Sequence, residues 1–132
     1  MITREEFENK VLNILNPRDQ ALIILRYFLP AKWTNRAITK LTSNDIKAEG
    51  GFVLIISTMF TESIPIKGNE KLLQALFDYR RGKLILFGFH TNVRFWIICK
   101  NYNLNSELIV LTRLEHLVAQ QKPVVETTYS AV

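Results

Sequence analysis

Apolar positions near the start of the chain recur at helical spacing. Phe7, Val11 and Ile14 fall on one face of a helix, which we expect over residues 3–15. The sequence Thr3-Arg4-Glu5-Glu6 opens it as a capping box, in which the threonine hydroxyl and the second glutamate each satisfy an amide of the first turn. The chain is therefore expected to begin with an amphipathic helix that packs one face against a core.

The next segment is apolar on most faces of a helix. Residues 17–29 read PRDQALIILRYFL, and Asn16-Pro17 supplies a cap and a proline suited to the first helical position. An apolar helix of this kind is buried at the centre of a domain. Pro30 ends it, and a shorter helix is expected over residues 34–41, closed by the turn-rich residues 42–45.

The pattern changes from helix to strand after Gly50-Gly51. Residues 52–56 are apolar and rich in β-branched side chains, and residues 61–66 alternate, which together predict a β-hairpin. Pro65 cannot donate a ladder hydrogen bond, so the second strand is expected at the edge of the sheet.

Helical periodicity returns in the second half of the chain. Helices are expected over residues 70–81, 91–102 and 106–121. A brief extended piece at residues 84–87 separates the first two. This order of elements predicts one domain over residues 1–132, mainly α with a small antiparallel β-hairpin or sheet, which is an α+β fold.

The composition indicates a packed core and no membrane span. Hydrophobic residues make up 48% of the chain, but no apolar run approaches the roughly 18 residues that a spanning helix requires. Trp33, Phe95 and Trp96 are expected in the core, because basic residues do not alternate with them as on a base-stacking surface. Acidic residues near the N-terminus do not fit a secretory signal, so we expect a cytoplasmic protein.

Side chains that bind metals are few. Cys99 is the only cysteine, which excludes an intramolecular disulfide and a cysteine-based metal cage. His90 and His116 alone do not make a metal site, and there is no glycine-rich phosphate loop. The sequence therefore predicts neither a metal nor a cofactor.

The charge of the chain is biased toward positive. Seventeen lysines and arginines stand against 12 acidic residues, and the net charge of +5 favours a polyanionic partner. Arg36 and Lys40 lie four residues apart on a predicted helix, so they share a face suited to phosphate contacts. The densest cluster, Arg80-Arg81-Gly82-Lys83, also suits the negative end of a helix dipole. The candidate DNA-binding residues are Lys32, Arg36, Lys40, Arg80, Arg81 and Lys83.

Three segments carry a resemblance to a known family. They are residues 3–29, the sequence LTSNDI at Leu41–Ile46, and the triplet Ile64-Pro65-Ile66. They resemble, in turn, the first two helices, the segment after the first catalytic arginine and the Val-Pro-Leu hairpin end of the tyrosine recombinase catalytic domain, the phage-integrase and Xer family. The similarity extends from residue 3 to about residue 80. It implies a tyrosine-recombinase catalytic-core-like fold that binds double-stranded DNA.

The chemistry of that family can be checked position by position. A tyrosine hydroxyl attacks a DNA phosphate, two arginines and a histidine hold its oxygens, and a lysine protonates the leaving hydroxyl. By the resemblance, Thr34 stands where the first arginine is expected, and Ser57-Thr58-Met59 where the hairpin lysine is expected. Loss of one preorganised donor costs about 10²–10³ in rate. We therefore expect a core that is catalytically impaired or that depends on a partner.

Two registers are open for the second half of the resemblance. In the first, Arg94 matches the family's second arginine, His116 its later histidine and Tyr129 the nucleophile. In the second, residues 94–103 form the structural helix that precedes the arginine motif, which survives as Arg113-Leu114-Glu115-His116. The first register makes Arg94, His116 and Tyr129 the candidate catalytic groups of a minimal active recombinase.

The leading interpretation is a DNA-binding protein with an integrase-like core, of the kind expected in a mobile element, virus or plasmid. It is expected at the nucleoid, or in the host cell if viral, as a homo-oligomer or with a partner recombinase.

Two alternatives belong to other classes of protein. Residues 15–42 also resemble a helix-turn-helix of the sigma-factor type, which indicates a transcription regulator. The last predicted helix has an apolar stripe that suits the interface of a protein-interaction domain: Leu108, Leu111, Leu114, Leu117 and Val118.

Overall fold

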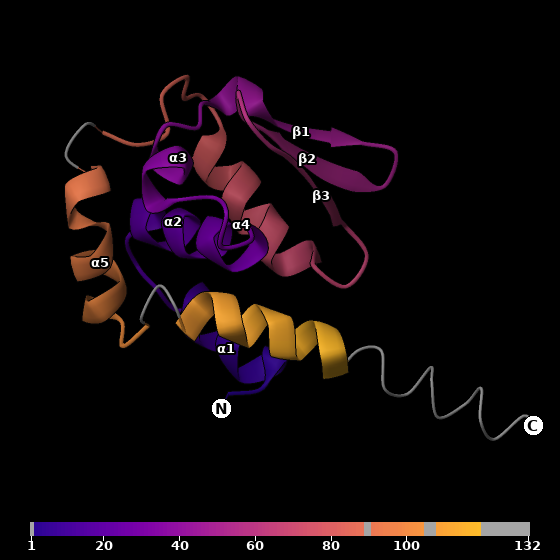
Figure 1. The fold of residues 1–132 in the computed structure, drawn as a ribbon, viewed down its shortest axis with the longest axis vertical. Coiled ribbons are helices and arrows are strands. Elements are labelled where there is room, and N and C mark those ends of the chain that lie inside the picture. Colours follow the sequence, from indigo (N-terminus) through magenta and orange to yellow (C-terminus); the bar gives the residue numbers. More distant parts are fainter. Residues whose placement is uncertain (1, 89–90, 105–107, 120–132) are drawn as a thin grey trace, which may run out of the picture.

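The structure is a computed structural model that describes residues 2–88, 91–104 and 108–119, with the backbone alone for residues 91–94 (Figure 1). In chain order its elements are α1 (Arg4–Leu12), α2 (Pro17–Phe28), α3 (Asn35–Thr39), the 3-10 helix η1 (Ser43–Asp45), β1 (Ile46–Glu49), β2 (Phe52–Ile56), β3 (Thr61–Pro65), α4 (Glu70–Arg80) and α5 (Thr91–Asn101). Residues 108–119 are also helical. The described part is mainly helical with a small antiparallel sheet, which confirms the α+β prediction. None of its helices is long and apolar enough to cross a membrane.

The central helix is α2, as predicted. Every residue from Ala21 to Phe28 is buried, and the helix packs against α1, α3, α4 and α5. The Asn16 side-chain oxygen accepts the amides of Arg18 and Asp19 at 3.0 and 3.2 Å, and Pro17 takes the first helical position. The cap and the proline therefore define the start of this helix as the sequence predicted.

The first helix is shorter than predicted. Thr3 Oγ1 accepts the amide of Glu6 at 3.1 Å, which confirms the threonine half of the predicted capping box. The helix ends before Ile14, which is nevertheless buried, whereas Leu15 is 95% exposed. Leu15 was included in the helix by its spacing, but the turn between α1 and α2 directs it to solvent.

The sheet has three antiparallel strands in the order β1-β2-β3. The predicted hairpin is the β2–β3 pair, and Pro65 lies in an edge strand as expected. The strand β1 was not predicted, because Ile46 is its only buried residue and residues 47–49 are exposed. Gly50 and Gly51, with φ of +60° and +82°, make the turn from β1 to β2.

The sheet covers one side of the helical cluster. Its buried residues, which come from all three strands, are Ile46, Val53, Ile55 and Ile64. Figure 1 shows the sheet at one side of the helices, α5 at the other, and α3 between them. This arrangement places α3 close to the loop that joins β2 to β3.

One prediction about the aromatic core is wrong. Trp33 and Phe95 are 0% and 1% exposed, as expected, but Trp96 is 61% exposed. Adjacent residues of a helix point about 100° apart. Phe95 occupies the face of α5 that packs on the domain, so its neighbour is turned toward solvent.

Candidate nucleic-acid interface

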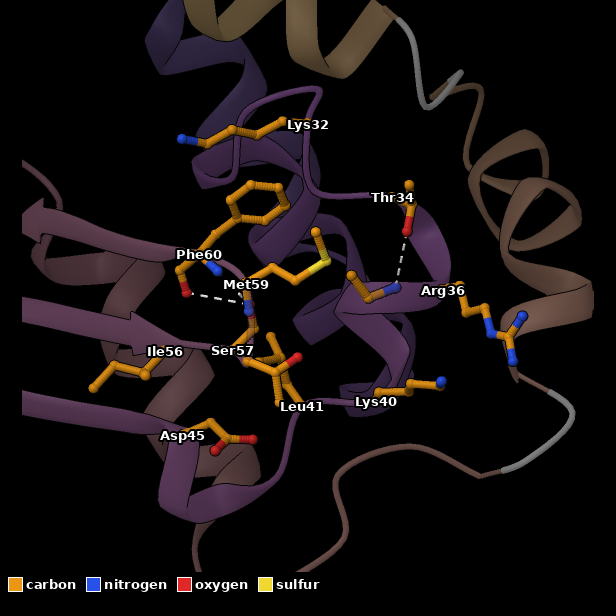
Figure 2. Close-up of a pocket in the computed structure, with 12 residues that line it drawn as sticks. Lys32, Thr34, Arg36, Lys40, Leu41, Asp45, Ile56, Ser57, Met59 and Phe60 are labelled. Carbon is orange, nitrogen blue, oxygen red and sulfur yellow. Dashed lines mark hydrogen bonds between the residues drawn. The ribbon is translucent and has the colours of Figure 1, made fainter.

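A cavity of about 740 Å³ lies between α3 and the loop from β2 to β3 (Figure 2). It is lined by residues from three segments of the chain: Lys32, Thr34, Arg36, Ala37, Lys40, Leu41, Asp45, Ile56, Ser57, Thr58, Met59 and Phe60. Three of the six sequence-predicted DNA-binding residues, Lys32, Arg36 and Lys40, are therefore brought together at one place.

The chain between α2 and α3 is held by a buried arginine. The Arg26 guanidinium donates to the carbonyl oxygens of Trp33, Leu29 and Pro30 at 2.6, 3.0 and 2.8 Å. It also donates to the side-chain oxygen of Asn35 at 3.0 Å. Burial lowers the pKa of Arg26 from its ordinary value, because removal from water disfavours the charged guanidinium. The four hydrogen bonds fix the segment that carries Lys32 and Thr34.

Two of the cations that line the cavity, Arg36 and Lys40, come from α3 and its C-cap. Thr34 is its N-cap, and its hydroxyl oxygen accepts the amide of Ala37 at 3.1 Å. Arg36 and Lys40 are exposed, and in Figure 2 both side chains extend from the α3 wall away from Met59 and Phe60. The Thr34 hydroxyl thus holds the N-terminal end of α3, next to Arg36, and Lys40 lies at the other end of the helix.

The opposite wall is a tight turn closed by Ser57. Its hydroxyl oxygen accepts the amides of Met59 and Phe60 at 3.3 and 2.9 Å, and donates to the Phe60 carbonyl oxygen at 3.1 Å. The Phe60 ring lies 5.8 Å from the Trp33 ring, and the Lys32 ammonium lies 5.1 Å from the Phe60 ring centre. The two walls are therefore in contact through Lys32, Trp33 and Phe60.

The charge around the cavity is positive. Within the described part of the chain, Lys32, Arg36 and Lys40 form no ion pair with a carboxylate. Asp45 also lines the cavity, but one of its oxygens accepts the amide and hydroxyl of Thr42 at 2.8 and 3.1 Å. The three cations are thus available to an anion from outside.

The second predicted basic group is more engaged with the protein. Arg80 donates to the Ser43 carbonyl oxygen at 3.0 Å, which ties α4 to η1. Arg81 forms an ion pair with Asp78 at 3.3 Å, and the Lys83 ammonium lies 4.6 Å from an aromatic ring centre. Arg81 and Lys83 are exposed. None of these three residues lines the cavity.

His116 has a structural environment. It is 7% exposed, its Nδ1 shares a hydrogen bond of 2.6 Å with the Tyr27 hydroxyl, and its Nε2 lies 3.2 Å from the Ile2 carbonyl oxygen. A carbonyl can only accept, so Nε2 donates to Ile2 and Nδ1 accepts from Tyr27 in the neutral ring. These bonds fasten residues 108–119 to α2 and to the segment before α1, and His116 does not line the cavity.

The other two catalytic candidates are only partly placed. Arg94 lies in α5, a helix that packs against α3, but its side chain is outside what the structure describes. Tyr129 lies outside the described residues. Of the three candidate catalytic side chains, the structure therefore describes only that of His116.

Two features of the site were not predicted from the sequence. One is the hydrogen bonding of Arg26 to the loop between α2 and α3, although an arginine within the apolar run of residues 21–29 was a visible signal. The other is the contribution of Ser57 to Phe60 as a wall, for which no local pattern exists. No cluster of three metal-ligating side chains occurs among the described residues.

Comparison with known proteins gives no further constraint. No protein-family model, no curated protein and no solved structure matches this chain. The tyrosine recombinase resemblance therefore stays a prediction from the sequence.

Proposed function

We propose that this protein binds double-stranded DNA through the cations at the rim of the cavity. The observation that carries the proposal is that Lys32, Arg36 and Lys40 surround one opening and have no carboxylate partner in the described part of the chain. Unpaired cations gathered on one face are the usual electrostatic footprint of a phosphate-binding surface.

The resemblance to tyrosine recombinases supports the same surface. The two positions at which that family is expected to hold its first arginine and its hairpin lysine correspond to Thr34 and Ser57-Thr58-Met59. All of these residues line the cavity, although they are separated by more than twenty residues in the chain. Their convergence is what a recombinase-like core requires of phosphate-binding positions.

We propose binding without strand cleavage. Thr34 and Ser57 supply hydroxyls in place of charged donors, and both hydroxyls bond backbone amides. A threonine does not replace a bidentate arginine on a phosphate. The buried hydrogen bonds of His116 give that residue a structural role, which leaves the minimal active recombinase without support from the described side chains.

The helix-turn-helix alternative receives no support from the geometry. A recognition helix presents several side chains along the major groove. Here α3 spans only Asn35–Thr39, and the chain then enters η1 and β1.

The test is a titration of a fluorescent duplex at several salt concentrations. Each phosphate contact contributes a slope of about −0.9 in log K against log salt, so three contacts give about −2.7. The variant Arg36→Glu/Lys40→Glu is expected to bind about tenfold or more weakly at low salt, with a slope near −0.9. The control Lys10→Glu/Lys71→Glu has the same net charge but leaves the cavity lining intact. Equal losses in both variants would show that only net charge matters.

A second candidate function, self-association, is favoured by the helix at residues 108–119. Its core-facing residues are Ile109, Thr112 and His116. Its opposite face is apolar and exposed, with Leu111, Leu114 and Val118 at 50, 54 and 55%. Exposed apolar stripes of this kind mark interaction surfaces.

We propose that a second copy of the chain covers this stripe. Sedimentation equilibrium is expected to show a concentration-dependent dimer that Leu111→Lys converts to monomer. A monomer at all concentrations for the parent protein would reject self-association.

A further inference from the structure

The floor of the cavity is apolar, unlike its rim. Apolar carbon atoms come from Ala37 in α3, from Leu41 just after it and from Ile56 in β2. Met59 and Phe60 add a thioether and a ring. Contacts to the phosphates and sugars of a duplex are made by polar and charged groups. An apolar floor is therefore not explained by binding of the duplex backbone alone. The volume of about 740 Å³ is within the range of sites that enclose small molecules, about 300–1,000 Å³.

The aromatic and thioether side chains of the β2–β3 loop suit a flat, apolar-faced group. The Phe60 ring is supported from behind by Trp33, and Met59 is 79% exposed at the mouth. In Figure 2 the Met59 side chain lies between Phe60 and the start of α3. A methionine thioether is flexible and polarisable, so it can pack against a planar ring that enters the cavity.

The positive charges of the rim indicate the kind of ligand to which the flat group belongs. Arg36 and Lys40 extend outward from the α3 wall at the rim, and Lys32 lies over the Phe60 ring on the other side of the opening. A ligand with a planar apolar part flanked by negative charges on both sides satisfies the floor and the rim together. A nucleotide within a DNA strand has this chemistry.

We propose that the cavity takes a single unpaired DNA base, with its ring on the apolar floor and its flanking phosphates on Arg36 and Lys40. This inference rests on the proposed DNA binding and narrows it to duplexes with an unpaired or extruded nucleotide. A paired base within the stack cannot reach the cavity, because its faces are covered by its neighbours.

The experiment compares three DNA molecules of otherwise identical sequence. One is a perfect duplex, one carries a single bulged 2-aminopurine, and one carries a bulged abasic residue with the same backbone. The protein is expected to bind the 2-aminopurine bulge roughly tenfold more tightly than the other two, which is within the contribution of stacking one base. Quenching of 2-aminopurine fluorescence is expected on binding.

Two variants test whether the cavity is responsible. Ala37→Phe fills the floor from a half-buried helix position, and Met59→Ala removes packing surface from a largely exposed one. In Ala37→Phe the ratio of affinities for the 2-aminopurine bulge and the abasic bulge is expected to fall to about one. In Met59→Ala it is expected to decrease severalfold. The exposed substitution Lys10→Glu, which is outside the cavity, is expected to leave the ratio as it is.

The outcomes separate this inference from the proposed function. Equal affinity for the 2-aminopurine and abasic bulges overturns the base site, while binding of all three duplexes leaves the DNA-binding proposal intact. A ratio that stays high in Ala37→Phe also overturns it, because the base is then held elsewhere. Absence of binding to any of the three at low salt overturns both proposals.

Discussion

Replacement of Arg26 by methionine is expected to loosen the segment that carries the basic rim. The guanidinium is the common donor to the carbonyl oxygens of Leu29, Pro30 and Trp33 and to the Asn35 side chain. Methionine has a similar length but no donor. The variant therefore keeps most of the packing and removes all four hydrogen bonds at once.

Two opposing effects set the size of the loss in stability. Removal of the buried charge also removes its desolvation cost, which favours the variant. Against this, an unsatisfied buried acceptor costs about 1–3 kcal/mol. The bonds to Trp33 and Leu29 are buried, whereas those to Pro30 and Asn35 are partly buried and can be replaced by water. Counting the two buried acceptors and the opposing gain, we expect the free energy of unfolding to fall by about 2–4 kcal/mol.

The assay is urea denaturation followed by circular dichroism, with a DNA titration under native conditions. Arg18→Met is the matched control, because Arg18 lies on the same helix with an exposed side chain and is expected to cost about 0.5 kcal/mol or less. In Arg26→Met the slope of log K against log salt for DNA binding is expected to become less steep by about 0.9, because the contact from Lys32 is lost. An unfolding free energy within about 0.5 kcal/mol of the parent would refute this role of Arg26.

Three further predictions concern other parts of the structure. His116→Ala is expected to lower the free energy of unfolding, measured in urea, by about 2–4 kcal/mol, because it leaves a cavity and removes the hydrogen-bond partner of the Tyr27 hydroxyl. An unchanged free energy of unfolding would contradict the anchoring of residues 108–119. Burial raises the pKa of the Cys99 thiol to about 12. Because the native state holds this proton more tightly than the unfolded chain, the contribution of the Cys99 thiol to the free energy of unfolding is expected to be full below about pH 9 and to be lost between about pH 9 and 12. In Cys99→Ala the urea midpoint should therefore fall less over this range. Thr34→Arg is expected to lose about 1 kcal/mol of stability with the α3 cap, yet to steepen the salt slope of DNA binding by about 0.9; an unchanged slope would place position 34 away from the DNA.

The fold could be predicted where local signals were strong. The start of α2 depends on Asn16 and Pro17, whose effects are confined to neighbouring amides, so the sequence alone predicts it. The strand β1 has only Ile46 buried, and its pairing with β2 comes from a neighbour that local periodicity does not include. The prediction that Trp96 is buried was wrong for a related reason, because the rest of the domain determines which face of α5 packs.

The candidate site could be predicted in its charges but not in its shape. Arg36 and Lys40 share a helix face by spacing alone, and the structure places both at the cavity. Lys32 joins them only because Arg26 folds the intervening loop back, and this requires a buried contact seven residues away in sequence. The apolar floor combines α3 with Met59 and Phe60, which are distant in sequence and come together only in the folded domain.

The same geometry explains why DNA binding and DNA cleavage separate in our proposal. The hydroxyls of Thr34 and Ser57 accept backbone amides and so stabilise the two walls of the cavity. Phosphate binding is left to Lys32, Arg36 and Lys40, which are exposed and have no partner that fixes their side chains among the described residues apart from the contact of Lys32 with Phe60. Mobile cations attract a phosphate chain effectively, because the attraction depends on charge and falls slowly with distance. Transfer of a phosphoryl group demands donors held to about 0.5 Å around a single phosphorus atom. In our proposal, a core whose walls are held by hydrogen bonds and whose rim cations have no carboxylate partner among the described residues binds DNA but lacks the preorganisation that catalysis needs.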